Sequence, residues 1–190
     1  MTTVPQSPGV ETLIRSLDAA VSQRDDATIC ERVKHVLEET FGMGGDLLDP
    51  AVLRVDPTRY ARRLLHRDPD GRYSVVVMVW GPGQGTDLHD HAGRWCVECV
   101  HRGTIRVTSY EMTSAPSAEL SDFREVEVVH AGPGEAGALI PPFEYHRIEN
   151  PHSETAVTVH VYAAELTACN VYVPVNGGYR RELRHLSYTD

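Results

Sequence analysis

The stretch G-Q-G-T-D-L-H-D-H-A-G-R-W-C-V-E-C-V-H-R-G, from Gly83 to Gly103, decides which fold and which site the rest of the chain must supply. His89 and His91 are two residues apart, and residues at that spacing on a β-strand point to the same face of a sheet. The pattern therefore predicts a strand that directs two imidazole rings toward one metal ion. Gly81 and Gly85, with Gly83, allow the backbone to bend just before the pair.

The composition limits the classes of protein to consider. The 190 residues are 41% hydrophobic and 24% charged, which suits one well-buried domain and is short for two. A formal net charge of −9 without a basic block argues against a nucleic acid or an anionic membrane as partner. No apolar run approaches the length of a membrane span and the N-terminus lacks a secretory pattern, so we expect a cytoplasmic location.

The cysteines do not form a disulfide framework, because they are few and scattered. The chain has four: Cys30, Cys96, Cys99 and Cys169. Cys96 and Cys99 form a C-x-x-C pair, but no second pair follows at zinc-ribbon spacing. On a strand, residues three apart point to opposite faces, which disfavours a joint metal or redox role for the two thiols.

Two helices are predicted at the start of the chain, within about residues 8–42. Apolar residues recur at helical spacing from Val10 to Val21 after a Ser7-Pro8 start, and from Ile29 to Leu37 before a stop at Gly42. We expect both helices to cover a sheet and to carry no chemistry.

From about residue 58 to residue 186 the pattern changes to short strands separated by turns. The D-P-D-G turn between R-Y-A-R-R-L-L-H and the apolar run Tyr73–Trp80 favours a hairpin, although periodicity alone leaves a helix open for the first segment. Further strands are expected around Trp95–Val100, Thr104–Tyr110, Arg124–Val129, Gly137–Ile140, Thr155–Tyr162 and Val171–Val173. The fold class is therefore mainly β, a β-sandwich or small barrel, in a single domain over residues 1–190.

A third metal ligand is available in P-P-F-E-Y-H-R-I-E-N, where His146 follows a Pro-Pro turn. The two histidine segments, in this order, resemble the paired motifs of the cupin superfamily. The matching residues are Gly83, His89, His91 and Gly103 in the first motif, and Pro141, His146 and Asn150 in the second. Cys96 stands where the first motif has glutamate, and Phe143 stands where the second has glycine. The resemblance implies a jelly roll with an N-terminal helical cover.

The cysteine at position 96 changes the expected chemistry. Three neutral imidazoles without a carboxylate leave the full dipositive charge on the metal, so the site should accept an anionic ligand from a substrate. A thiolate is the obvious candidate, because metal binding favours deprotonation of a coordinating thiol. Three ligands on one face also leave open positions for a chelating substrate and for dioxygen.

Among cupins, the chain resembles the thiol dioxygenases, specifically the cysteine dioxygenases, from about Thr58 to Cys169. Those enzymes have H-D-H followed five residues later by cysteine, as here at Cys96. They have H-R-V-E-N at the third ligand and S-L-H-L-Y downstream, where this sequence has H-R-I-E-N and T-V-H-V-Y. The Tyr-x-Arg before the hairpin, the Trp-Gly after the apolar strand and a later cysteine also match, in Tyr60-Ala61-Arg62, Trp80-Gly81 and Cys169.

The resemblance implies that one Fe(II) ion is held by three ligands, His89, His91 and His146. Its implied reaction is the oxidation of cysteine by O2 to cysteine sulfinate, a step of cysteine catabolism. Cysteine would bind as thiolate and amine, and the planar guanidinium of Arg62 would clamp its carboxylate. Tyr60 would support Arg62, whereas the neighbouring Arg63 is expected to face solvent.

Three further residues gain roles from the same resemblance. Tyr162 would hold its hydroxyl near the bound substrate and oxygen, and His160, on the same strand face, would orient it. Thr158 replaces the family serine of this relay and can make the same hydrogen bond. In the family the motif cysteine can bond to the tyrosine as a thioether crosslink, and Cys96 and Tyr162 occupy both positions.

Two other functions stay open. A 3-mercaptopropionate dioxygenase would use the same metal site, but such relatives tend to carry glutamine at the carboxylate position, so Arg62 favours cysteine. Because Arg62 and Arg63 are adjacent, a shift of one residue in the alignment would change that assignment. The more distant alternative is a non-redox metal-binding cupin, which the missing glutamate and the pair of His160 and Tyr162 disfavour.

Overall fold

The helical cover at the N-terminus forms as predicted. The computed structural model describes residues 7–42, 44, 47–115 and 117–190. Its helices are α1 (Pro8–Ala20), α2 (Asp26–Gly42) and a short 3-10 helix, η1 (Pro50–Leu53). Ser7 caps α1 by accepting a hydrogen bond from the backbone N–H of Val10, and Pro8 suits the first turn because no donor is lost there. Within these ranges no helix is long and apolar enough to cross a membrane.

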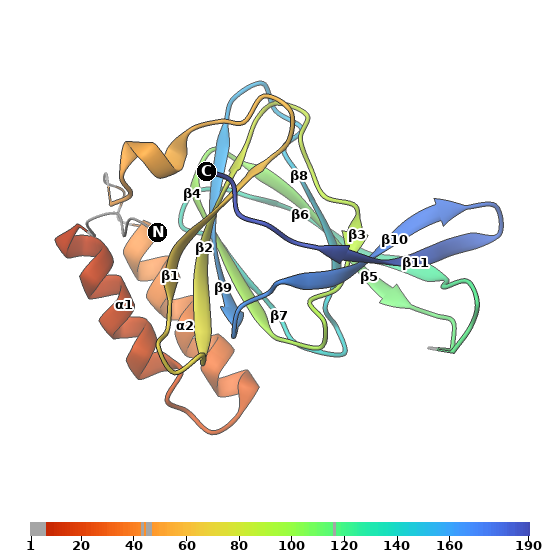
Figure 1. Ribbon diagram of the computed structural model, residues 1–190, viewed down its shortest axis with the longest axis horizontal. Helices are drawn as coiled ribbons and strands as arrows, with labels where there is room; N and C mark the ends of the chain where they lie inside the picture. Colours follow the sequence, from red (N-terminus) through yellow and green to blue (C-terminus); the bar gives the residue numbers. More distant parts are fainter. Residues whose placement is uncertain (1–6, 43, 45–46, 116) are drawn as a thin grey trace.

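The strands form two antiparallel sheets, and the predicted mainly β architecture with an N-terminal helical cover is confirmed (Figure 1). In spatial order the five-stranded sheet consists of β1 (Ala61–Arg67), β2 (Tyr73–Trp80), β9 (Ala156–Ala163), β4 (Cys96–Arg102) and β7 (Ala136–Leu139). The six-stranded sheet consists of β11 (Gly178–His185), β10 (Ala168–Val175), β3 (Leu88–His89), β8 (Tyr145–Glu149), β5 (Ile105–Met112) and β6 (Phe123–Ala131).

Neighbouring strands in each sheet are often distant in the chain. Strand β9 lies between β2 and β4, and β3 lies between β10 and β8. The register places His89 opposite His146 and Cys96 opposite Tyr162. These two cross-strand pairs assemble the site from segments that are more than fifty residues apart in sequence.

The central strands β2 and β9 of the five-stranded sheet are buried on both faces. The outer face of the sheet packs against α1 and α2, and its inner face packs toward the six-stranded sheet. In β2 the residues alternate between these faces, with Val75, Val77 and Val79 outward and Val76, Met78 and Trp80 inward. This double burial explains why Tyr73–Trp80 is a continuous apolar run rather than an alternating one.

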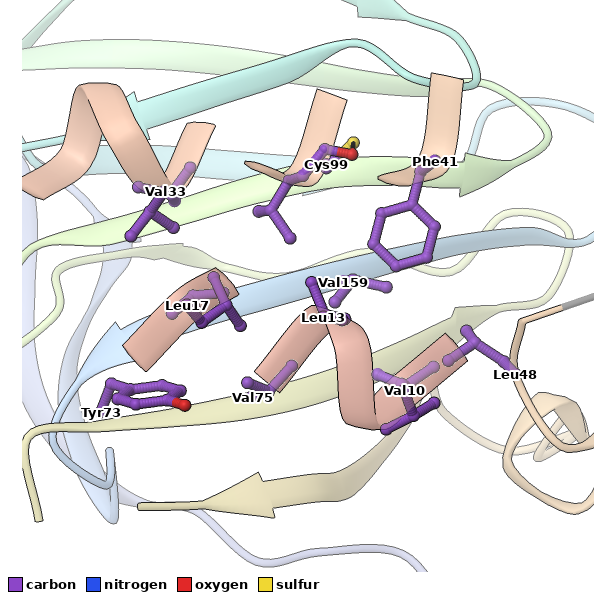
Figure 2. Packing of buried hydrophobic residues seen from close by; sticks show 14 of the residues in the cluster. Val10, Leu13, Leu17, Val33, Phe41, Leu48, Tyr73, Val75, Cys99 and Val159 are labelled. Atoms are coloured by element: carbon purple, nitrogen blue, oxygen red, sulfur yellow. Dashed lines mark hydrogen bonds between the residues drawn. The ribbon is translucent and has the colours of Figure 1, made fainter. Parts of the chain in front are cut away.

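Apolar side chains from both helices fill the outer core (Figure 2). Leu13 and Leu17 of α1, and Val33 of α2, are fully buried and belong to one cluster with Val75 of β2 and Val159 of β9. Burial of a leucine side chain contributes roughly 1.5–3 kcal/mol. Polar contacts supplement this apolar layer, since the Tyr73 hydroxyl at the start of β2 donates to the Asp18 carboxylate of α1 at 3.2 Å.

The β1–β2 hairpin confirms the prediction from its D-P-D-G turn. Gly71 adopts a φ of +72°, which a residue without a Cβ tolerates best. Asp68 is buried, and its carboxylate accepts hydrogen bonds from the backbone N–H and from the guanidinium of Arg72. Arg72 also reaches Asp18 of α1 at 2.7 Å, so the turn ties the hairpin to the helical cover.

The expectation that Arg63 faces solvent is wrong. Only 8% of Arg63 is exposed, and its Nη1 donates to the backbone carbonyls of Val52 (3.2 Å) and Arg54 (2.7 Å). The segment around η1 covers the outer side of β1, which the sequence pattern offered no means to anticipate. Arg63 therefore donates hydrogen bonds to backbone carbonyl groups of the segment that connects the helices to β1.

Strand β11 and the C-terminal tail are additions to the predicted strands. The charge-rich segment Gly178–His185 pairs with β10 as a largely exposed edge strand, and the resulting hairpin extends away from the helices (Figure 1). Beyond it, the Thr189 N–H donates to the Arg62 carbonyl at 2.7 Å, and the Thr189 hydroxyl accepts from the Arg62 N–H at 3.1 Å. The tail thus runs beside β1 next to Arg62.

Candidate functional site

His91 reaches the site by a route different from the predicted one. Strand β3 ends at His89, so His91 does not alternate with it on one strand. Instead, Asp90 is buried and anchors the turn, accepting hydrogen bonds from the backbone N–H groups of Ala92 and Asn170 and from the Asn170 side-chain amide at 2.7 Å. Ala92 has a φ of +54°, so the chain reverses directly after the histidines. This anchored turn, rather than strand periodicity, directs the second imidazole.

The structure brings His89, His91 and His146 together. Their ring centroids lie 4.5 Å apart for His89 and His146, 4.9 Å for His91 and His146, and 5.3 Å for His89 and His91. One nitrogen of each ring lies within 4.8 Å of the others, as ligands of a single ion would. His91 and His146 are buried, while His89 is partly open to the pocket.

The protonation of these rings suits a metal. The Nδ1 of His89 lies 3.0 Å from the Asp87 carbonyl, which can only accept, so Nδ1 carries the hydrogen and Nε2 is left with its lone pair. That Nε2 lies 3.2 Å from the Nε2 of His146. Burial lowers the pKa of all three imidazoles, which keeps them in the neutral form that coordinates metals. The donor set fits a transition-metal ion such as iron or zinc.

A pocket of about 280 Å³ opens onto this cluster. Arg62 lines it together with Tyr60, Tyr162 and Leu166. Only 4% of Arg62 is exposed; its Nη2 donates to the Leu166 carbonyl at 2.8 Å, whereas its buried Nε has no hydrogen-bond partner among the described residues. The pocket is therefore lined by a buried guanidinium as well as by His89 and His146 of the histidine cluster.

Tyr188 of the C-terminal tail also holds this arginine, and sequence reasoning missed it. The Arg62 guanidinium lies 4.7 Å from the Tyr188 ring centroid, a cation–π distance. The Tyr188 hydroxyl donates to Glu165 at 2.9 Å, which fixes the ring. Tyr60, predicted to support Arg62, stacks on Trp80 with ring centroids 4.7 Å apart. Its supporting role stays a prediction.

Thr158 and His160 form the hydrogen bond that the substitution of serine by threonine predicts. The Thr158 Oγ1 lies 2.7 Å from the His160 Nε2 and accepts from the Trp80 Nε1 at 2.9 Å. The rings of His160 and Tyr162 are stacked with centroids 5.9 Å apart. Burial places the pKa of His160 at about 3 and raises the pKa of Tyr162 well above its usual value. Both side chains are consequently neutral in the folded protein.

Cys96 and Tyr162 are directly opposed across β4 and β9, and both are buried. Burial, followed by the nearby Glu98 carboxylate, raises the pKa of the Cys96 thiol well above its ordinary value, and a hydrogen bond with Tyr162 acts in the other direction. Cys99 lies on the outer face of β4, near Leu37 of α2. The predicted separation of the two cysteines onto opposite faces is confirmed.

Glu98 is a second residue of the site that sequence reasoning missed. It follows Cys96 by two residues on β4 and therefore points to the same inner face, with 5% of its surface exposed. Its carboxylate lies near the imidazoles of His146 and His160. Burial raises the pKa of Glu98 to about 8. The available signal was its place in C-V-E-C-V, a charged residue at an inward position of a strand that is otherwise apolar.

Comparisons with known proteins place the sequence in a family. Residues 46–174 match the family model described as cysteine dioxygenase type I. Cysteine dioxygenase type 1 of Rattus norvegicus is 25% identical over 120 residues, covering 63% of this chain and 58% of the rat protein. That of Danio rerio is 24% identical over 172 residues, covering 90% of this chain and 82% of the zebrafish protein. The chain thus spans little more than half of the rat relative.

Solved structures match more distantly. A protein from Thermus thermophilus is 21% identical, with a TM-score of 0.48 over 63% of this chain and 98% of that one. A conserved protein with a double-stranded β-helix domain from Klebsiella pneumoniae is 19% identical, with a TM-score of 0.47 over 60% of this chain and 80% of that one. The family model, by contrast, covers well over half of the sequence, and on that match the chain belongs to the cysteine dioxygenase type I family.

Proposed function

We propose that this protein is a thiol dioxygenase that oxidises L-cysteine with O2 to cysteine sulfinate at one Fe(II) ion. The observation that carries the proposal is a small pocket lined both by Arg62 and by His89 and His146 of the three-histidine cluster. Family membership supports the reaction class. In this reaction both oxygen atoms of O2 pass to sulfur, which loses four electrons while O2 gains four, so no further reductant is required.

His89, His91 and His146 would hold the metal, and their buried, neutral imidazoles support that role. When bound, Fe(II) supplies the exchange of electrons with oxygen, which zinc cannot provide. The absence of a carboxylate from the ligand set favours an anionic thiolate from the substrate. The pocket of about 280 Å³ suits a small thiol rather than a larger thiol such as a peptide.

Arg62 would bind the substrate carboxylate. A guanidinium presents parallel N–H groups that match two carboxylate oxygens, and the buried Nε is not occupied by any described residue. Arg63 is committed to carbonyl groups on the other side of β1, which supports the choice of Arg62 over its neighbour. A carboxylate clamp of this kind serves cysteine and 3-mercaptopropionate alike, so the assay has to separate them.

Tyr162 would keep its proton and point its hydroxyl at the bound substrate, since burial raises its pKa well above the ordinary value. His160 would limit the movement of Tyr162 through their stacked rings, and Thr158 would fix His160. A thioether between the Cys96 sulfur and the Tyr162 ring would remove one hydrogen from each residue, with O2 accepting the two electrons. Their cross-strand register supports this crosslink.

The test uses anaerobically purified protein loaded with Fe(II) and given cysteine, 3-mercaptopropionate or cysteamine, with O2 uptake and sulfinate product both measured. We expect cysteine to give the highest kcat/KM, with one sulfinate formed for each O2 consumed. Preference for 3-mercaptopropionate would replace the proposed substrate while keeping the reaction class. Absence of O2 uptake with every thiol would favour a non-redox metal-binding cupin instead.

The crosslink has its own measurement. Peptides carrying Cys96 and Tyr162 should appear joined, lighter by two hydrogens than their sum, after turnover with cysteine and O2. The Cys96→Ser variant should show only separate peptides. Cys99→Ser is the matched control, because Cys99 lies on the outer face and should leave the crosslink unchanged.

A further inference from the structure

Glu98 is a buried acidic residue that has no arginine or lysine partner among the residues the structure describes. It lies on the inner face of β4 with 5% of its surface exposed, and its Oε2 makes no hydrogen bond within the described part of the chain. The ion-pair partners found for it are two histidines rather than arginine or lysine. Burying a carboxylate in this way costs free energy unless something compensates its charge. Such a residue calls for a functional reason.

The two carboxylate oxygens face two different imidazoles. Oε1 lies 3.8 Å from the Nδ1 of His146, and Oε2 lies 3.3 Å from the Nδ1 of His160. Both Nδ1 atoms are buried and lack a hydrogen-bond partner among the described residues. The contact with His160 is built into the sheet, because Glu98 and His160 are opposed across β4 and β9.

The opposite edge of His146 points to the metal cluster. Its Nε2 lies 3.2 Å from the Nε2 of His89, so a metal bound there would leave the hydrogen of His146 on Nδ1, facing Glu98. Histidines that bind metals usually direct their second N–H to a carboxylate or carbonyl, which orients the ring and makes it a stronger ligand. At 3.8 Å the attraction is electrostatic rather than a formed hydrogen bond.

We propose that Glu98 is a positioning residue whose carboxylate holds the Nδ1 edges of His146 and His160, so that one group anchors both the metal ligand and the relay histidine. The inference rests on the proposed metal site but not on the oxidation of a thiol. The proposed role of Glu98 also changes the charge expected around the metal, because the sequence predicted three neutral imidazoles and no carboxylate. The carboxylate lacking at position 96 is present two residues later, behind the ligands, where it partly neutralises the metal without occupying a coordination position.

The decisive experiment measures metal affinity rather than activity. Wild type, Glu98→Gln and Glu98→Leu are titrated anaerobically with Fe(II), and with Co(II) as a spectroscopic probe, against a competing chelator. We expect Glu98→Gln to bind roughly tenfold more weakly and Glu98→Leu up to about 100-fold more weakly, which is the usual range for such partners. Glutamine keeps an acceptor for the N–H and loses only the charge. Glu127→Gln, an exposed carboxylate on β6, is the control and should bind as wild type does.

The remaining readouts separate positioning from folding and from direct ligation. The melting temperature of metal-free Glu98→Gln should not fall below that of wild type, since the Glu98 Oε2 makes no hydrogen bond with the described residues that the variant could lose; a lower melting temperature would assign Glu98 to folding and overturn the proposal. One metal ion should bind to every variant. Because the ligand atoms of Cys96, Glu98 and His160 lie within 4.8 Å of one another, loss of a second ion from the variants would make Glu98 a ligand instead.

The other outcomes are distinguishable. Equal affinities in wild type and Glu98→Leu would overturn the positioning role alone. Weaker metal binding in the variants, combined with no thiol oxidation by wild type, would defeat the proposed function and leave the positioning role in place. A wild-type chain that binds no metal would defeat both.

Discussion

The two faces of the five-stranded sheet differ completely in chemistry although the same strands build them. The outer face of β2, β4 and β9 is apolar and packs on the helices, and Figure 2 shows Val75, Cys99 and Val159 in this cluster. The inner face of β4 and β9 carries the polar groups of the site, Cys96, Glu98, Thr158, His160 and Tyr162. Alternation along a strand allows this division, because each residue has the opposite orientation to its neighbour.

The difference between the two faces indicates which side chains serve stability and which serve function. Aliphatic side chains on the outer face can close-pack without needing partners. On the inner face every polar atom needs a partner or a ligand, and several ring and carboxylate atoms there have none among the residues that are described. We therefore expect outer-face substitutions to change the free energy of unfolding, and inner-face substitutions to change binding and catalysis as well.

The largest effect should follow from a cavity in the outer core. Leu17 of α1 is fully buried there, so Leu17→Ala should lower the free energy of unfolding by roughly 2–5 kcal/mol. Chemical denaturation of the metal-free protein measures this loss. The folded fraction should keep its kcat/KM, because the helix does not touch the pocket. Leu183→Ala, on the exposed strand β11, is the control and should change stability by less than about 0.5 kcal/mol.

The two adjacent arginines of β1 should separate an effect on substrate binding from an effect on stability. Arg62→Ala should raise KM for cysteine roughly 10–100-fold, the loss expected for a charge-assisted hydrogen bond of about 1.5–3 kcal/mol, while the bound metal is retained. Arg63→Ala should leave KM unchanged and lower the free energy of unfolding, because it leaves the Val52 and Arg54 carbonyls without their donor. Steady-state kinetics, metal analysis and denaturation distinguish the two. Loss of metal from Arg62→Ala would instead mark it as structural.

Two substitutions at adjacent positions of β9, each of similar shape to the original residue, should both lower the free energy of unfolding, for opposite reasons. Thr158→Val removes the hydroxyl that pairs the Trp80 and His160 ring nitrogens, and Val159→Thr introduces a hydroxyl into the aliphatic layer. Each should cost roughly 1–2 kcal/mol in denaturation experiments. Only the first should also alter the pH profile of kcat. Thr158→Ser should restore it, and failure of serine to do so would count against the hydroxyl as the relevant group.

The smallest effect concerns the turn that ties β1 and β2 to α1. Hydrogen bonds from Arg72 lower the pKa of Asp68 from 3.8 to about 2. Because the folded value lies below the ordinary one, this contribution is present above about pH 4 and is lost as pH falls toward 2. Arg72 is partly exposed, so we expect up to about 1 kcal/mol. Denaturation of Asp68→Asn at several acidic pH values should show a shallower decline than wild type; an identical decline would contradict the assignment.

Much of the site could be predicted from local patterns. The spacing of H-D-H, the third histidine after Pro-Pro and the opposite orientation of Cys96 and Cys99 all follow from short-range rules, and the structure agrees on their grouping. The helix at Pro8–Ala20 and the hairpin after Asp68 were predictable for the same reason, since caps, helical periodicity and turn residues act over a few positions.

The sequence by itself therefore determined the two N-terminal helices, the β1–β2 hairpin and most of the strands, and it pointed to the three histidines that the fold brings together. Only the tertiary structure decided what surrounds them: that a connecting segment buries Arg63, that an anchored turn directs His91, and that the tail places Tyr188 against Arg62. It also placed Glu98 behind two imidazoles. Strand alternation fixes the side to which a residue points, whereas the groups that meet it there come from segments distant in the chain, and no local pattern encodes those contacts.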